Sequence, residues 1–240
     1  MIQGYLSQYF VGAGTKVLSN VDATARSNQH EVGDGQKGEA LKRVLGDTER
    51  KSGNRFRAKY VWIKEEQEFF TEEGYLSWYD TRANQPSRSP EWRLYYQTND
   101  ITEAMTEGDR LIIARQQDDT ILFIVTPRFS PCETGLLWLF GLDPQTESGF
   151  DFHTLEKDET RLDFTARIIL DEIGVEFEDP NANSLDQIIE KFGLEFPDTR
   201  EFSDLARLTL PEVDAKDDPD GALLTWLDHE EAMFRRLEKK

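Results

Sequence analysis

Two segments of this sequence combine arginine, asparagine, glutamine, serine and histidine with very few large apolar side chains. The first segment, residues 16–33, is KVLSNVDATARSNQHEVG, and the second, residues 80–96, is DTRANQPSRSPEWRLYY. A long polar connection inside a compact domain is usually either functional or disordered. We call these segments the first arm and the second arm, and ask what chemistry their side chains can do.

The side chains of both arms are of the types that read nucleic acids. Arginine pairs with guanine O6 and N7, asparagine or glutamine with adenine N6 and N7, and glutamate accepts from cytosine N4. Serine, threonine, lysine and backbone N–H groups hold phosphates. Composition alone leaves a second interpretation open, in which both arms are solvated loops.

A nuclease active site is a further candidate. Pro197-Asp198 followed by Asp214-Ala215-Lys216 matches the loose pattern PD…(D/E)xK, in which carboxylates hold Mg²⁺ and a lysine assists the attacking water. That site needs its acidic residues on neighbouring strands, whereas the residues between the two motifs predict a helix and a linker. We therefore predict that this chain alone does not cleave DNA.

Other catalytic and metal sites lack their required spacing. The segment DAKDDPDGALLTWL offers Asp218, Asp220 and Gly221 at calcium-loop positions, but Lys216 and Leu227 occupy the first and last ligand positions. The three histidines are far apart and form no HExxH frame, and VGAGTK lacks the spacing of a phosphate-binding Walker loop. We expect no cofactor for this chain, and Mg²⁺ only for an attached nuclease domain.

The elements that must position the arms are mostly short strands. Alternating or continuous apolar residues predict strands over 5–11, 55–63, 75–80, 91–97, 110–115 and 120–125, with a short helix over 38–46. Helical periodicity begins after the turn residues at 141–149 and predicts helices over 160–174, 184–193 and 217–240. Asp218 and Pro219 are suited to begin the last of these helices, which runs to residue 240 as if leading into a further domain.

Composition and charge agree with this division. The 240 residues have a net charge of −19. Residues 1–150 contain 17 Lys and Arg against 22 Asp and Glu, a net −5, whereas residues 151–240 contain 11 against 25, a net −14. A local basic patch decides phosphate affinity, so the total does not exclude DNA. One cysteine and the lack of a signal peptide or an apolar run of membrane length indicate a cytoplasmic protein without a membrane partner.

Three blocks of the chain carry a family resemblance. The first arm resembles the first DNA-contacting arm of the N-terminal effector domain of EcoRII-type restriction endonucleases, in a frame of Lys16, Leu18-Ser19, Asp22 and His30-x-Val32-Gly33. The segment WYDTRANQPSRSPEWR, residues 78–93, is similar to the second arm of that domain. Residues 196–237 resemble the linker into the nuclease domain of the same family. The order and spacing of these blocks carry the resemblance over nearly the whole chain.

The resemblance implies a B3-like DNA-binding pseudobarrel over residues 1–145 and a helical acidic extension, or linker toward an absent nuclease domain, over 146–240. The expected fold is thus mainly β with α, and the expected function is sequence-specific binding of double-stranded DNA through two arms in the major groove. Compared with the family, the first arm is one residue longer, Arg26, Ser27 and Asn28 replace glycines, and Trp92 replaces a basic residue. These departures concern the recognised sequence more than binding itself.

The candidate DNA-binding residues follow from the arms and the resemblance together. We expect His30 and Gln29 to approach base edges, and Lys16 and Ser19 to approach the backbone. Arg88 and Arg93 are the expected guanine readers, with Glu91 either accepting from a cytosine amino group or orienting Arg93. Alternatives from other classes are a protein-interaction or regulatory module and a stand-alone PD-(D/E)xK nuclease. The full set is Lys16, Ser19, Asp22, Arg26, Ser27, Asn28, Gln29 and His30 of the first arm, and Arg82, Asn84, Ser87, Arg88, Glu91, Trp92 and Arg93 of the second.

Overall fold

The computed structural model places most of the chain in two units. It describes residues 5–23, 30–33, 38–46, 51–65, 68–85, 87–146, 149–155, 166, 169–170, 173–175, 198–210, 213, 215–216 and 218–238. The larger unit comprises Tyr5–Thr160 and Ile168–Val175, and the smaller comprises Met1–Gly4, Arg161–Arg167 and Glu176–Lys240. We describe each unit by itself.

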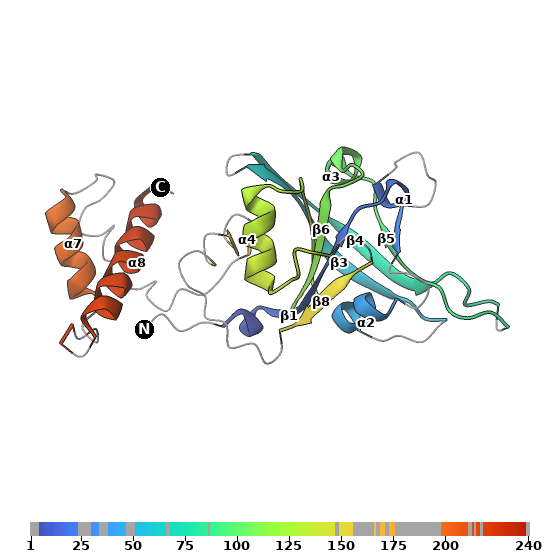
Figure 1. Cartoon of the computed structure of the whole chain (residues 1–240), viewed down its shortest axis with the longest axis horizontal. Coiled ribbons are helices and arrows are strands. Elements are labelled where there is room, and N and C mark those ends of the chain that lie inside the picture. Colours follow the sequence, from blue (N-terminus) through green and yellow to red (C-terminus); the bar gives the residue numbers. More distant parts are fainter. Residues whose placement is uncertain are drawn as a thin grey trace. The chain divides into compact units, whose positions relative to one another are not determined.

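The larger unit is built on one curled, half-barrel sheet of eight strands (Figure 1). Its order is β2-β5-β4-β3-β7-β6-β1-β8, and every neighbouring pair is antiparallel except β3 and β7. With comparable amounts of helix and strand, the protein is mixed α/β. The strands are β1 (Phe10–Val17), β2 (Glu31–Gly33), β3 (Asn54–Glu65), β4 (Glu68–Asp80), β5 (Trp92–Tyr96), β6 (Arg110–Gln116), β7 (Ile121–Thr126) and β8 (Asp151–Thr154).

Alternation and burial explain which way the strands face. In β3, Phe56, Ala58 and Tyr60 are buried in the core, whereas the intervening Arg55 and Arg57 are exposed. Such alternation is typical of a strand with one solvated face. Strand β7 and most of β6 are buried on both faces, and α4 (Pro131–Phe140) covers this part of the sheet on the side away from the main core (Figure 1).

Short helices connect the strands of the larger unit. They are η1 (Leu6–Gln8), α1 (Asn20–Ala23), α2 (Glu39–Leu45), α3 (Asp100–Ala104) and α4. Ser130 caps α4 by accepting from the Glu133 N–H, and Pro131 occupies its first position. Buried Arg110 then joins the sheet to α4, because its Nε donates to the Glu133 carboxylate at 2.7 Å.

The predicted strands after residue 50 and the helix over 38–46 are confirmed, the latter ending at Gly46. The strand predicted over 5–11 is wrong, because Leu6–Gln8 form a 3₁₀ turn and the strand occupies Phe10–Val17 instead. Residues 12–15, which include Gly12 and Gly14, were not predicted as part of a strand. These glycines permit β8 to approach, since a Cβ at Gly12 or Gly14 would lie 3.1 Å from a carbonyl oxygen of β8. The sheet therefore includes a strand beyond the expected boundary at 145/146.

The smaller unit contains α7 (Thr199–Leu208) and α8 (Pro219–Glu238), which contact each other. Asp198 caps α7 by accepting from the Glu201 N–H, and Asp218 accepts from the Gly221 N–H at the start of α8. The prediction of a helix from Asp218 and Pro219 is thus confirmed. The helix predicted over 184–193 and most of that over 160–174 lie outside the described residues. Among the described helices, none combines the length and apolar character needed to span a membrane.

Candidate functional site

The two arms end at neighbouring strands of the sheet, β2 and β5. The first arm connects β1 to β2, and the second connects β4 to β5. Strand β5 lies between β4 and β2, so that Gly33 of the first arm pairs with Arg93, and Arg93 pairs with Tyr79 on its other side. The second arm projects from the sheet (Figure 1). Residues more than 40 positions apart in the sequence therefore share one edge of the molecule.

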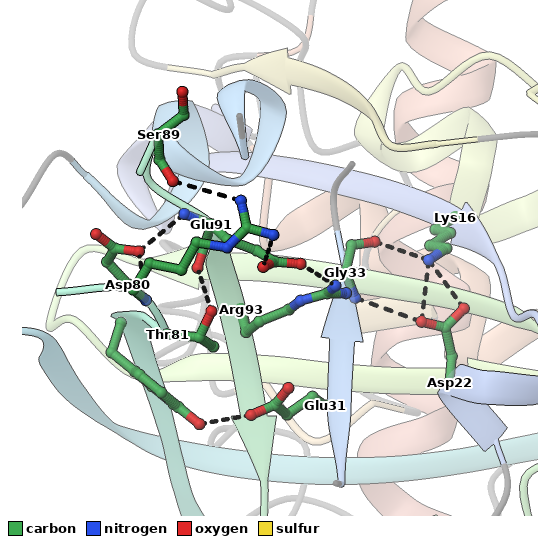
Figure 2. Close-up of polar contacts among 11 residues, drawn as sticks. Lys16, Asp22, Glu31, Gly33, Asp80, Thr81, Ser89, Glu91 and Arg93 are labelled. Carbon is green, nitrogen blue, oxygen red and sulfur yellow. Dashed lines mark hydrogen bonds and ion pairs between the residues drawn. The ribbon is translucent and has the colours of Figure 1, made fainter. Parts of the chain in front are cut away.

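Lys16 holds the base of the first arm. Its ammonium donates to the Gly33 carbonyl oxygen at 2.7 Å and contacts the Asp22 carboxylate at 2.8 Å (Figure 2). The side chains of Lys16 and Asp22 are only 12% and 4% exposed. An ammonium committed to these partners fixes the residues on either side of 24–29 relative to each other. Lys16 thus positions the arm, which differs from its expected place on the DNA backbone.

Asp22 also organises α1. Its carboxylate accepts from the backbone N–H of Ser19 at 2.9 Å and from the Ser19 hydroxyl. The Asp22 carbonyl oxygen accepts from the buried Tyr96 hydroxyl at 2.8 Å, and the burial of that phenol raises the pKa of Tyr96 to about 12. Expected as a DNA contact, Asp22 is almost entirely buried and belongs to the support of the arm.

The second arm is closed at its base by Asp80, which is buried. One carboxylate oxygen of Asp80 accepts from the backbone N–H of Arg82 at 2.9 Å and from that of Glu91 at 2.8 Å. The Thr81 N–H donates to the Glu91 carbonyl oxygen at 2.9 Å. These bonds bring the two ends of the arm together, as at the neck of a hairpin.

Glu91 joins two of the candidate arginines (Figure 2). One of its carboxylate oxygens lies 2.5 Å from Arg82 Nη2, and the other accepts from Arg93 Nη2 at 2.7 Å. The hydrogen bond from Arg93, reinforced by the charges of the nearby arginines, holds the pKa of Glu91 below its usual value. Glu91 is therefore ionised at neutral pH and orients Arg93, which is one of the two roles expected for it.

The guanidinium of Arg93 lies directly against Gly33. A Cβ atom at residue 33 would be only 2.1 Å from Arg93 Nη1. Gly33 does not have a positive φ, so the need for glycine here comes from this close approach. Arg93 is 31% exposed and uses Nη2 toward Glu91, which leaves further N–H donors for a ligand.

The remaining arm residues are distributed between surface and core. Arg88 is exposed and donates to the Gln85 side chain at 3.1 Å, while Asn84 and Ser87 are exposed near it. His30 has φ 39° and its ring meets those of Tyr95 and Tyr96 edge to face, at 6.3 and 5.7 Å. The expected residues Arg26, Ser27, Asn28 and Gln29 lie outside the described residues.

Trp92 is a core residue, contrary to its place among the expected DNA contacts. It is 2% exposed and stacks on Trp78 with ring centroids 5.4 Å apart. The alternation of β5 decides this, because Arg93 and Tyr95 face out and Trp92 and Leu94 therefore face in. The sequence already contained this signal, since WRLYY alternates around Arg93.

Sequence reasoning missed several residues that support the arms. Asp80 and Tyr96 hold the two bases, and Tyr79 donates a hydrogen bond to Glu31 across β5. Burial, followed by this bond to a carboxylate, raises the pKa of Tyr79. No local pattern marks Tyr79 and Tyr96, because their partners Glu31 and Asp22 lie far away in the sequence.

The nuclease pattern is not assembled in the part of the chain that the structure describes. Asp198 is a helix cap, Lys216 lies in a turn, and Asp214 is outside the described residues. In those residues no group of three or more His, Cys, Asp or Glu side chains is arranged to hold a metal ion. A scan against models of protein families finds no match, and a search of curated proteins finds no significant relative.

Proposed function

We propose that this protein binds double-stranded DNA at a specific sequence, with the two arms entering the major groove. The observation that carries the proposal is the joining of Gly33, Arg93, Glu91 and Arg82 where the two arms end, at the paired strands β2 and β5. This arrangement presents a partly exposed guanidinium whose direction is set in advance by a carboxylate. Such preorganisation suits bidentate contact with guanine.

The two arms have different roles in this proposal. Arg93, held by Glu91, contacts a guanine, and exposed Arg88 contacts a second base or a phosphate near the tip of the second arm. His30, which precedes β2, faces the same duplex from the first arm. Lys16 and Asp22 hold the two ends of the first arm together, and do not touch DNA.

The resemblance to EcoRII-type enzymes supports a more specific assignment. We propose that the curled sheet is a B3-like pseudobarrel and that the protein is the recognition and effector part of an EcoRII-like restriction endonuclease. The smaller, acidic unit then corresponds to the connection toward the nuclease domain of such an enzyme. Mg²⁺ is required only by that domain.

The test begins with selection of bound duplexes from a randomised pool, followed by sequencing. Binding of the selected duplex and of its single-base variants is then measured by fluorescence anisotropy for the wild type, Arg93→Ala and Arg115→Ala. Arg115 is a matched control, because it is also partly exposed and paired with a carboxylate, that of Asp119 at 2.6 Å. It lies on β6, four strands from β5 and thus about 19 Å away across the sheet.

Loss of a bidentate base contact costs about 1–3 kcal/mol at one position of the site. We therefore expect Arg93→Ala to reduce discrimination at one base pair by about 5- to 150-fold, with Arg115→Ala unchanged. If no sequence is enriched, or if Arg93→Ala weakens all duplexes equally, specific reading by this arginine is refuted. Binding of a peptide or protein in place of DNA would support the interaction-module alternative.

A further inference from the structure

The outward face of β5, β4 and β3 carries a cluster of aromatic and arginine side chains beside the arms. Tyr95 pairs with Ser77, and Ser77 pairs with Arg55, so these three residues form one row across the sheet. Tyr75 lies two residues further along β4 on the same face. Tyr75 is 44% and Tyr95 36% exposed, and Arg55 is also exposed.

Arg55 and Tyr75 form a preorganised cation on this face. The guanidinium carbon of Arg55 lies 4.2 Å from the centroid of the Tyr75 ring. Among the described residues no carboxylate is paired with Arg55, whereas its neighbour Arg57 is paired with Asp118 at 3.1 Å. Stacking restricts the guanidinium while leaving its N–H donors at the edge of the plane directed to solvent, the arrangement that suits a phosphate.

The position of this pair relative to Arg93 follows from the strand register. Arg93 pairs with Tyr79, and Arg55 pairs with Ser77, two residues along β4. Two strand spacings across and two residues along place Arg55 about 12 Å from Arg93 on the same face. This separation corresponds to about three to four base pairs along a duplex.

We infer that Arg55, stacked on Tyr75, binds a backbone phosphate of the same duplex about three to four base pairs from the base pair that Arg93 contacts. The inference rests on the proposed function, because a duplex that touches Arg93 must lie over the face that Arg93 and Arg55 share. Tyr75 is a positioning residue here, and the contact adds affinity without sequence preference.

The experiment measures binding of the full chain to the selected sequence in two duplexes, one ending at the site and one extended by about six base pairs on each side. Affinity is determined between 50 and 200 mM salt, about the range over which phosphate contacts are distinguished. The variants are Arg55→Gln, Arg55→Lys and Arg43→Gln. Arg43 is the control, because its exposed guanidinium is stacked on Phe152 in the same way, at 4.4 Å, but on α2.

One phosphate contact contributes about 0.9 to the slope of log affinity against log salt. For the wild type, lowering the salt from 200 to 50 mM should raise the ratio of the affinities for the longer and the shorter duplex by about three- to fourfold. Arg55→Gln should abolish this change in the ratio. Arg55→Lys should retain the slope, and Arg43→Gln should equal the wild type. Base discrimination should be unchanged in all three variants.

Two results would overturn the inference while leaving the proposed function intact: wild-type behaviour of Arg55→Gln on both duplexes, or an equal loss in Arg43→Gln. Altered base discrimination in Arg55→Gln would replace the phosphate contact by a base contact. Absence of DNA binding by the wild type would remove both proposals together, so the two failures are distinguishable.

Discussion

Substitution of Gly33 by alanine tests whether the first arm sets the position of Arg93. The added Cβ would lie 2.1 Å from Arg93 Nη1 and 3.2 Å from Cζ. Because carbon and nitrogen need about 3.4 Å or more, the guanidinium must move by about 1.3 Å. Its hydrogen bond to Glu91 is 2.7 Å long and is lost beyond about 3.5 Å. Arg93 is therefore displaced from the orientation that Glu91 gives it.

The effect on stability should be small. Gly33 lies in a strand and has no positive φ, so alanine fits the backbone and gains about 0.4–1 kcal/mol by restricting the unfolded chain. A partly exposed ion pair contributes about 0.2–1 kcal/mol, so the two effects nearly cancel. We expect the free energy of unfolding to remain within about 0.5 kcal/mol of the wild type by these figures.

Binding should respond much more strongly than stability. Anisotropy competition between the selected duplex and its single-base variant should show discrimination reduced toward that of Arg93→Ala, by about 5- to 150-fold. Gly141→Ala is the opposite control. Gly141 ends α4 with φ 63°, and its added Cβ would meet only the His153 ring at 3.5 Å, so the substitution should lower stability by about 1–2 kcal/mol while leaving the Arg93–Glu91 pair in place.

Two outcomes would refute this reasoning. Full discrimination by Gly33→Ala, alongside its loss in Arg93→Ala, would show that the position of Arg93 against Gly33 is not the one used in binding. A large loss of stability in Gly33→Ala would show that the contact between the arms is part of the fold, and not a device for orienting the arginine.

Three further predictions concern charge and titration. Lys16→Met should lower the free energy of unfolding by about 3–5 kcal/mol in chemical denaturation, because it leaves the buried Asp22 carboxylate without its cation; an unchanged midpoint would contradict this. Burial raises the pKa of Tyr60 and Tyr96 to about 12, so the stability they contribute is complete below pH 10 and lost as pH rises toward 12. With Tyr79, whose pKa is also raised, three of the seven tyrosines should ionise late in a spectrophotometric titration. Because Arg93 lowers the pKa of Glu91, the stabilisation from this carboxylate is present above its unfolded pKa, near 4.5, and is lost as pH falls through the lower folded value. Base discrimination measured from pH 5 to 8 should therefore be constant. A fall in discrimination near pH 6 would assign the effect to another titratable group.

Local patterns in the sequence were sufficient for much of the larger unit. Alternation over β3 and β5, the continuous apolar residues of β6 and β7, and the terminal glycine of α2 each specify an element through contacts within a few residues. The start of α8 at Asp218 and Pro219 was predictable for the same reason. The strand over residues 12–17 was not predicted, because its glycines are explained only by the approach of a distant strand.

The arms also combine features that the sequence predicted with features that it did not. Residue types and spacing indicated where the arms are and that Glu91 and Arg93 act together, since these residues are two positions apart in the sequence. Strand β2 has only three residues and no pattern of its own, and its pairing with β5 is what places Gly33 against Arg93. Likewise, the sequence identified Lys16 as a cation, but the burial of Asp22 in α1 directs that cation inward. The sequence by itself determined which polar side chains the arms carry, and the tertiary structure decided which of them face solvent, because burial and strand pairing depend on residues far away in the chain.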